Sequence, residues 1–269
     1  MPTEDALGDR MKQYENLETG RRFLPGLPIY ARIDGRGFSR FTRGMQRPYD
    51  ARMSAAMIGT TKALVEHTHA TVGYVQSDEI SLVWIPTDNG HGWFDGKTMK
   101  MSSVLAGLAT SAFIRALFVE FGHEQGLDLM NQAPHFDARV ISMPSETEAA
   151  NMLLWRNMDA TKNAISMAAS HYYSHRDLHG RSGSEKQEML FQKGVNFNDY
   201  PAFFKRGTFV RRETAEMILT PDELSDIPEK HRPTGPVMRS VIREIDFPPL
   251  SRIQNTAAVL LHRADVVPR

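Results

Sequence analysis

The chain has 269 residues and contains no cysteine. Disulfide bonds, thiolate nucleophiles and zinc–cysteine sites are therefore excluded. Any metal ion must be bound by oxygen or imidazole ligands, and carboxylate ligands favour magnesium or manganese. The lack of cysteine thus restricts the chemistry of a metal site before any motif is considered.

The sequence also has no long apolar run and no excess of charge of one sign. No stretch reaches the roughly 20 consecutive apolar residues that span a bilayer. The charged segment 1–22 lacks the apolar core of a signal peptide, which predicts a cytoplasmic protein without a membrane partner. The 32 basic residues balance 32 acidic ones, so net charge neither requires nor excludes a nucleic-acid partner. The composition is that of an ordinary globular protein with one large domain, or a catalytic domain with a second lobe.

The first half of the chain alternates between strand-like and helix-like patterns. Apolar runs indicate the strands, and recurrence at three and four residues indicates the helices. The expected elements are strands at 28–34, two strands within 71–86 and a strand at 135–143, with helices at 51–67 and 98–121, the second ended by Gly122 and Gly126. This order is the βαββαβ arrangement of ferredoxin-like domains, which polymerase palms share. We therefore predict an α+β fold with a palm-like catalytic domain at 1–144.

The second half of the chain predicts helical and strand additions at 145–269. Ser145 and Glu148 form a capping-box pattern, which predicts a helix extending to about Tyr173. The Gly-, Ser- and charge-rich segment 174–187 predicts a mobile loop. The alternating segment 203–212 predicts a strand carrying four cations, and the tail after it is rich in proline and weakly patterned.

Two aspartates fall at the ends of strands that this fold would place side by side. Asp34 ends the first strand, and Asp78 lies at the tip of the predicted hairpin. Two such carboxylates can hold a pair of magnesium ions, one activating an attacking hydroxyl and the other neutralising a triphosphate and its pyrophosphate leaving group. Gly35 leaves room for a backbone carbonyl or a phosphate. An Asp-Gly pair alone is typical of a turn, so the joint placement carries the hypothesis.

The residues around both aspartates resemble motifs of the tRNA-histidine guanylyltransferase family. Segments 32–38 and 73–79 resemble its opening and hairpin motifs, and 47–50 resembles its Lys-Pro-Asn-Asp element. Later matches keep the family order: Trp155-Arg156 with Asp159, Lys186 with Glu188, Asn196-Phe197-Asn198, and Lys205-Arg206-Gly207-Thr208. The resemblance extends over roughly residues 28–212.

This resemblance implies a template-directed 3′–5′ nucleotidyltransferase that uses magnesium to add nucleotides to the 5′ end of tRNA. In the family, ATP first adenylylates a 5′-monophosphate, and the 3′-hydroxyl of an incoming nucleotide then attacks that end. The implied partners are tRNA, ATP, GTP and other nucleoside triphosphates, and the implied assembly is a homotetramer. The part at 145–269 would pack on the palm and contribute nucleotide and tRNA contacts.

The resemblance also assigns roles to individual residues. Asp34, Asp78 and the Gly35 carbonyl would bind two magnesium ions, with Glu79 as a further acidic catalytic residue. The implied nucleotide-binding residues are Gly35, Arg36, Gly37, Phe38, Arg47, Ser77, Lys97 and Lys100. The implied RNA-binding residues are Arg156, Asn163, Lys186, Asn198, Lys205 and Arg206. Lys97 and Lys100 would share one face near a helix N-terminus, where the dipole favours anions, although surface lysine pairs are more often solvated.

One departure from the family pattern concerns the substrate. Eukaryotic members carry a His-Ile-Asn-Asn-Leu-Tyr-Asn motif where residues 161–167 retain only Asn163. This resembles the bacterial-type branch, which is associated with 5′-end repair of tRNA, and it places strict guanosine addition to tRNA-histidine in doubt. We interpret His171, His175 and His179, spaced by four, as a solvated or RNA-facing segment.

Two alternatives remain open. A palm-domain nucleotide cyclase would share both aspartates but should lack the downstream family motifs. A catalytically idle RNA-binding protein would have no reason to retain both aspartates.

Overall fold

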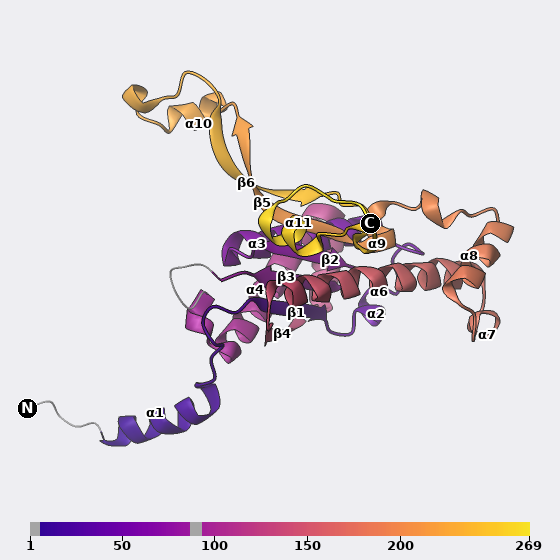
Figure 1. Ribbon diagram of the computed structural model, residues 1–269, viewed down its shortest axis with the longest axis horizontal. Coiled ribbons are helices and arrows are strands. Elements are labelled where there is room, and N and C mark those ends of the chain that lie inside the picture. The colour runs from indigo at the N-terminus through magenta and orange to yellow at the C-terminus, as the bar shows by residue number, and fades with distance from the viewer. Residues whose placement is uncertain (1–5, 87–92) are drawn as a thin grey trace, which may run out of the picture.

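The computed structural model describes residues 6–86 and 93–269, and its centre is a six-stranded antiparallel sheet (Figure 1). The strands are β1 (Ile29–Gly35), β2 (Val72–Gln76), β3 (Glu79–Trp84), β4 (Phe136–Ser142), β5 (Thr208–Met217) and β6 (Val237–Ile245). Their order across the sheet is β4-β1-β3-β2-β5-β6. Helices α3 (Ala51–Thr68) and α4 (Thr98–Phe121) connect the first four strands in the predicted order. The expectation that the first and third strands are neighbours is confirmed.

Helices cover both faces of the sheet, which explains why its central strands read as continuous apolar runs. On one face, Ile33 and Leu82 pack with side chains of α3 and α4. On the other face, Tyr30 and Val83 pack with α6 (Glu146–Tyr172) and α11 (Thr256–His262). Successive side chains of one strand therefore enter different cores.

Helix α4 is rich in apolar residues, but Lys100, Ser111 and Arg115 interrupt it, so it is not a continuous apolar run. Among the described residues, it is the one helix long and apolar enough to cross a membrane by length and composition alone. Met101, Leu105, Phe113 and Leu117 on this helix are fully buried, and α4 packs against α3, α5 (His123–Asn131) and β4. Such contacts bury 33% of its most apolar stretch, while Met99 and Val119 on the same helix are exposed.

Glycines end two helices where the chain must change direction. Gly122 has φ 77° and ends α4 as expected, whereas Gly126 lies inside α5 and does not break a helix. Gly207 also has φ 77°, and a Cβ there would lie 2.5 Å from the Val75 carbonyl oxygen. Only glycine fits this turn between α9 (Ala202–Arg206) and β5. The strand predicted at 203–212 therefore begins only at Thr208, because the residues before Gly207 belong to α9.

The predicted loop at 174–187 is wrong, because the segment is largely helical. It contains α7 (His175–Leu178) and the start of α8 (Gly183–Gln192). Each helix begins with a capping box, Ser174 with Asp177 and Ser182 with Glu185, in which each side chain bonds the other residue's backbone. The serine and acidic residues that indicated a loop therefore serve as helix caps. The cap predicted for α6 is present, since the Ser145 side chain accepts from the Glu148 amide.

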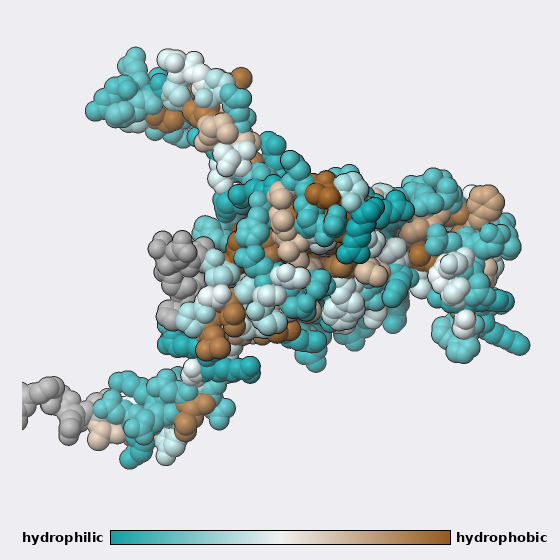
Figure 2. Space-filling view, viewed as in Figure 1, coloured by the Kyte–Doolittle hydropathy of each residue, from teal (hydrophilic) through white to brown (hydrophobic). Residues whose placement is uncertain are grey.

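Two segments project from the body of the molecule. Beyond residue 210, β5 leaves β2 and pairs only with β6, and this hairpin extends outward with α10 (Pro221–Ser225) and η3 (Glu229–His231) at its tip (Figure 1). Its surface is mostly hydrophilic with a few hydrophobic places (Figure 2). Ile218 and Met238 are exposed large hydrophobic residues of this segment. Helix α1 (Ala6–Thr19) projects elsewhere and has no buried residue. The remaining short elements are α2 (Phe38–Phe41), η1 (Trp93–Gly96), η2 (Phe197–Asp199) and η4 (Leu250–Arg252).

Candidate active site

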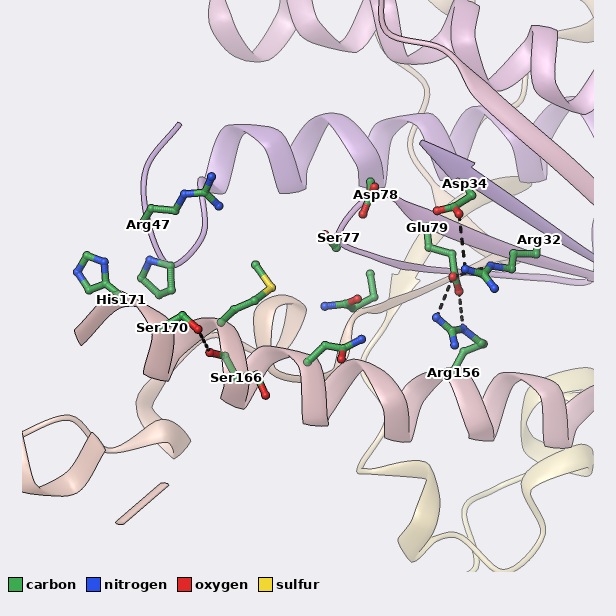
Figure 3. A pocket seen from close by; sticks show the side chains of 14 residues that line it. Arg32, Asp34, Arg47, Ser77, Asp78, Glu79, Arg156, Ser166, Ser170 and His171 are labelled. Atoms are coloured by element: carbon green, nitrogen blue, oxygen red, sulfur yellow. Dashed lines mark hydrogen bonds and ion pairs between the residues drawn. The ribbon is translucent and has the colours of Figure 1, made fainter. Parts of the chain in front are cut away.

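The structure brings Asp34 and Asp78 together at one edge of the sheet, although 44 positions separate them in the sequence (Figure 3). Asp34 pairs in register with Glu79, the residue that follows Asp78. The Gly35 amide donates a hydrogen bond to the Asp78 carbonyl at 3.0 Å. This bond ties the tip of the β2–β3 hairpin to the end of β1 and fixes the two aspartates beside each other.

The turns that carry the aspartates have demanding backbone geometry. Ser77, in the two-residue turn between β2 and β3, has φ 55°, which is uncommon for a residue other than glycine. A Cβ on Gly35 would lie 2.5 Å from the Phe38 ring, which covers the end of β1. Because no side chain larger than hydrogen fits there, Gly35 lets the chain fold back directly after Asp34.

The electrostatics at Asp78 fit a divalent cation. Burial raises the pKa of the Asp78 carboxyl, and the nearby charges of Asp34 and Glu79 raise it further. A cation between the aspartates would relieve this repulsion. The described residues contain no group of three or more His, Cys, Asp or Glu side chains positioned for a metal. Magnesium suits this sparse donor set, because it commonly combines one or two carboxylates with water and phosphate oxygens.

Glu79 has a different environment from the two aspartates. Arg156 donates to both carboxylate oxygens of Glu79, at 2.5 and 2.8 Å, and the Arg32 Nε lies 2.7 Å from one of them. The Glu79 side chain is only 10% exposed, so both arginines neutralise it in a confined space. Arg156 is itself held by Asp159 at 3.0 Å. With both oxygens occupied, Glu79 joins β3 to α6 and is not placed as a free metal ligand, unlike the catalytic role expected from the sequence.

A pocket of about 720 Å³ opens between the hairpin tip and α6 (Figure 3). Its sheet side carries Asp34 and Asp78. Its helix side is formed by six residues of α6, namely Arg156, Asn163, Ser166, Met167, Ser170 and His171. The sequence predicted Arg156 and Asn163 as binding residues and placed His171 in a solvated or RNA-facing segment. Ser166, Met167 and Ser170 were missed, although their intervals of three and four from Asn163 and from one another place them on one helical face.

A second, more apolar pocket of about 280 Å³ lies on the other side of the hairpin tip. It shares six lining residues with the first pocket, namely Arg47, Pro48, Gln76, Ser77, Asp78 and Met167. Its other walls are mostly apolar and include Phe38, Met45, Tyr49, Met53, Phe203 and Phe204. An apolar, partly aromatic pocket next to a polar one can receive a base on one side and phosphates on the other.

Asp50 holds the loop that carries Arg47 in place. Its carboxylate caps α3 by accepting from the Arg52 amide at 3.0 Å, and it also accepts from the Gln46 amide at 3.3 Å. Hydrogen bonding to the Arg52 guanidinium lowers the pKa of the Asp50 carboxyl. The Asp50 carboxylate therefore holds the loop through the Gln46 amide on one side and the Arg52 amide on the other. Arg47, which lines both pockets, lies within this loop.

The predicted RNA-binding residues divide into two groups. Arg156 and Asn163 line the larger pocket, and Lys186 reaches its wall by donating to the Ser166 hydroxyl at 3.0 Å. Asn198, Lys205 and Arg206 do not line either pocket. Lys205 donates to the Asn198 carbonyl, and the Arg206 carbonyl accepts from Tyr74 at 2.8 Å and from the buried Asn157 at 2.7 Å. These bonds attach α9 to the sheet and to α6.

Several predicted nucleotide-binding residues do not line either pocket. Arg36 is exposed, and Gly37, with φ 71°, precedes α2; neither lines the two pockets. Lys97 forms a β-bridge with Arg22, and the Lys100 ammonium lies 4.8 Å from the centre of the Phe94 ring.

Lys97 and Lys100 lie at the end of the sheet opposite the aspartates. They belong to the start of α4, directly after the Trp93 turn that stacks on Trp84. Trp84 ends β3 five residues beyond Glu79, a separation of about 17 Å along a strand. The expectation that both lysines face a triphosphate held by the aspartates of the same chain is therefore wrong.

Comparisons with known proteins agree with this geometry. A model of the family "tRNAHis guanylyltransferase" matches residues 8–144. The tRNA(His) guanylyltransferase of Schizosaccharomyces pombe is 30% identical over 218 residues, covering 76% of this chain and 79% of that protein. A bacterial tRNA(His) guanylyltransferase-like protein in complex with ATP superposes with a TM-score of 0.69 and 33% identity, covering 77% of this chain and 87% of the other. A bacterial tRNA(His) guanylyltransferase-like protein in complex with GTP has a TM-score of 0.69 and 28% identity, covering 92% and 94%.

The fold, the paired aspartates and these matches together define a nucleotidyltransferase. Within that class, the chain belongs to the tRNAHis guanylyltransferase family.

Proposed function

We propose that this protein is a magnesium-dependent 3′–5′ nucleotidyltransferase that adds nucleotides to the 5′ end of tRNA. The observation that carries the proposal is the pairing of Asp34 and Asp78 through the Gly35–Asp78 hydrogen bond, at the junction of an apolar and a polar pocket. Two adjacent carboxylates between a polar and an apolar pocket support a nucleotide site in which the phosphates lie beside them.

We assign the first part of the chain, 1–144, to a ferredoxin-like polymerase palm. The strand order β4-β1-β3-β2, with α3 and α4 as the two connections, supports this assignment. The second part, 145–269, extends the same sheet through the pairing of β5 with β2 and supplies α6 as the facing wall of the site. It therefore contributes nucleotide and tRNA contacts from a position packed on the palm.

The residues of this site divide the work of nucleotide transfer. Asp34, Asp78 and the Gly35 carbonyl would hold two Mg²⁺ ions, which when bound activate a hydroxyl and neutralise phosphate charge. The apolar pocket beside Phe38 and Met53 receives a base. Arg47, which lines both pockets, lies where it can bind the phosphates between them. The ion pairs of Glu79 with Arg156 and Arg32, which we call the Glu79 clamp, keep β3 and α6 at a fixed separation around the 5′ end of the acceptor tRNA.

We infer that ATP and GTP bind at this site, with ATP activating the RNA 5′ end and nucleoside triphosphates serving as the added units. The titles of the two bacterial structures name these nucleotides, and both chains are similar to this one over most of its length. A nucleotide cyclase shares the paired aspartates, but the family matches favour the transferase.

The preferred acceptor is a tRNA whose 5′ end is incomplete. Residues 161–167 form part of the pocket wall, through Asn163, Ser166 and Met167, and they lack the motif of the eukaryotic members. Without that motif, selection of the added nucleotide falls to base pairing with the opposite strand.

The experiment compares four tRNAs that lack their first nucleotide and differ in the opposing base, alongside full-length tRNA-histidine. The protein should add the complementary nucleotide to each truncated tRNA and should do so faster than it adds an unpaired guanosine. Equal or reversed rates would assign it to guanosine addition instead, and a cyclic mononucleotide as the product would assign it to the cyclases.

Lys97 and Lys100 enter this proposal through a second copy of the chain. They lie too far from Asp34 and Asp78 to contact the same nucleotide within one chain. If they bind nucleotide phosphates, as the family resemblance implies, they serve the site of a neighbouring subunit in a homotetramer. Co-assembly of a variant that lacks both lysines with a variant that lacks the Asp78 carboxylate tests this arrangement.

A further inference from the structure

A third cavity, of about 560 Å³, lies at the end of the sheet opposite the aspartates. It is found where β1 begins and β3 ends, since both Ile29 and Trp84 line it and pair in register. Its lining residues come from five segments far apart in the sequence, which are 23–29, 68–71, the described residues of 84–101, 211–212 and 261–263. We name it the Trp–Arg cavity. It shares no lining residue with the two pockets beside Asp78.

One side of the Trp–Arg cavity carries two stacked tryptophans. The rings of Trp84 and Trp93 are nearly parallel, with an interplanar angle of 12° and centroids 6.3 Å apart. The Trp84 indole donates to the Thr68 carbonyl at 3.0 Å, which fixes its orientation. Both tryptophans are only half-buried. Phe94 packs on Trp93 with ring centroids 4.2 Å apart, so Trp84 offers a ligand more free ring surface than Trp93 does.

The other side of the cavity carries three guanidinium groups, from Arg211, Arg212 and Arg263. Arg211 is 9% exposed and pairs with Glu213. Arg212 donates to two neutral groups, the Ser240 hydroxyl at 3.0 Å and the Glu66 carbonyl at 3.1 Å.

Arg263 completes this cationic side. It donates to the Arg212 carbonyl at 2.9 Å, and its Nε lies 3.8 Å from Glu213. Among the ion pairs of the described residues, Glu213 is thus the one carboxylate that pairs with any of these three arginines. The cavity has a net positive charge on this side, with Arg212 and Arg263 the cations least compensated.

We propose that the Trp–Arg cavity binds a nucleoside phosphate, with the base against the tryptophans and the phosphate on Arg212 and Arg263. Planar bases stack on exposed aromatic rings, and guanidinium groups match the geometry of phosphate oxygens. The cavity volume lies within the range of small-ligand sites. The same chemistry is offered by a free nucleotide and by one nucleotide of a single-stranded RNA, and binding needs no metal.

The three tryptophans of the chain allow this site to be observed separately from the active site. In a Trp155→Phe background, Trp84 and Trp93 are the remaining tryptophans, and both line the cavity. The fluorescence of this protein is measured without magnesium while GMP, AMP, a 5′-phosphorylated five-nucleotide RNA or inorganic phosphate is added. We expect saturable quenching by a nucleotide or by the RNA, but not by phosphate alone.

Substitution of the arginines supplies the second half of the test. Arg212→Ala and Arg263→Ala should each weaken the nucleic-acid ligand about tenfold, since each removes one phosphate contact. Arg212→Lys should lie between the parent and Arg212→Ala, because it keeps the charge and loses the planar fork. Arg115→Ala is the matched control, as this exposed arginine lies on the outer side of α4, outside the cavity.

The outcomes separate the sources of the ligand. Quenching by mononucleotides as well as RNA assigns the site to free nucleotides, and quenching by RNA alone assigns it to an RNA strand. Absence of saturable quenching would overturn the proposal, as would arginine variants that keep the parent affinity and melting temperature. Equal effects of phosphate alone would overturn the role of the tryptophans. Because the assay needs no catalysis, its failure leaves the proposed transferase activity unaffected.

Discussion

The two ends of the central sheet present different charged groups and are assembled in different ways. At one end, a backbone hydrogen bond joins the end of β1, which carries Asp34, to the β2–β3 turn, which carries Asp78, and burial raises the pKa of Asp78. At the other end, tryptophans and arginines from distant segments surround the Trp–Arg cavity. The first end thus pairs two carboxylates for a cation next to arginines that can meet phosphates, and the second presents arginines to an anion.

The two ends differ in how far apart in the sequence their residues lie. The carboxylate end uses short motifs around one strand pairing, so a local sequence pattern can reveal it. The arginine end requires the C-terminal helix α11 and β5 to close over the first strands. Removing single groups from each end should therefore produce separable effects.

The largest effect is expected from removing the charge of either aspartate. Asp34→Asn and Asp78→Asn should lower nucleotide addition by about a thousandfold or more, because phosphate charge would no longer be neutralised in the transition state. The measurement is single-turnover addition to a 5′-triphosphorylated RNA, which bypasses activation. Tryptophan fluorescence at the Trp–Arg cavity should not change.

Asp128→Asn, on the exposed side of α5, is the control for this pair and should behave like the parent. Activity within tenfold of the parent in either site variant would contradict the metal-binding assignment.

A smaller effect is expected from Arg156→Ala, which leaves the Glu79 carboxylate with Arg32 as its remaining arginine. Breaking a largely buried ion pair should lower the free energy of unfolding by about 3 kcal/mol, as measured by urea denaturation. Combining Arg156→Ala with Glu79→Gln should cost less than the sum of the two changes, because the unpaired charge is then absent.

The exposed Arg181–Glu185 pair provides the comparison for this clamp. Arg181→Ala should change stability by less than about 1 kcal/mol, since surface ion pairs contribute little. If the losses of unfolding free energy in the Arg156 and Glu79 single variants simply add up in the double variant, the Glu79 clamp does not couple β3 to α6.

The smallest effect is expected from Lys97→Ala and Lys100→Ala, which should raise the Michaelis constant for nucleotide about tenfold. If the lysines act on a neighbouring subunit, a co-assembled mixture of the double lysine variant with Asp78→Asn should recover activity that neither shows alone at low nucleotide concentration. Lys12→Ala, on the exposed face of α1, is the control. If the mixture is no more active than the separate variants, the lysines do not act on the site of a neighbouring subunit.

Much of the first half of the fold could be predicted from the sequence, because its strands and helices have clear periodicity. The paired aspartates followed from that order, since β1 and β3 had to be neighbours. The second half was less predictable. The capping serines at 174 and 182 resemble loop residues. In β6, apolar and polar residues follow one another in pairs and not singly, so the alternation typical of a strand is absent.

Within the site, the sequence identified the acidic residues but not their different environments. Asp78 and Glu79 are adjacent, yet one is half-buried with a raised pKa and the other is held by two arginines. Arg156 and Arg32 reach Glu79 from different elements, and no local pattern predicts that meeting.

By itself, the sequence of this protein determined the order of strands and helices, the two aspartates at strand ends and the family to which the motifs point. These features depend on local periodicity and on residues close together in the chain. The tertiary structure decided the arginine clamp on Glu79, the distance of Lys97 and Lys100 from the aspartates, and the Trp–Arg cavity. Each of these depends on side chains from segments far apart in the chain, which only the closure of α6, β5 and α11 around the sheet brings together.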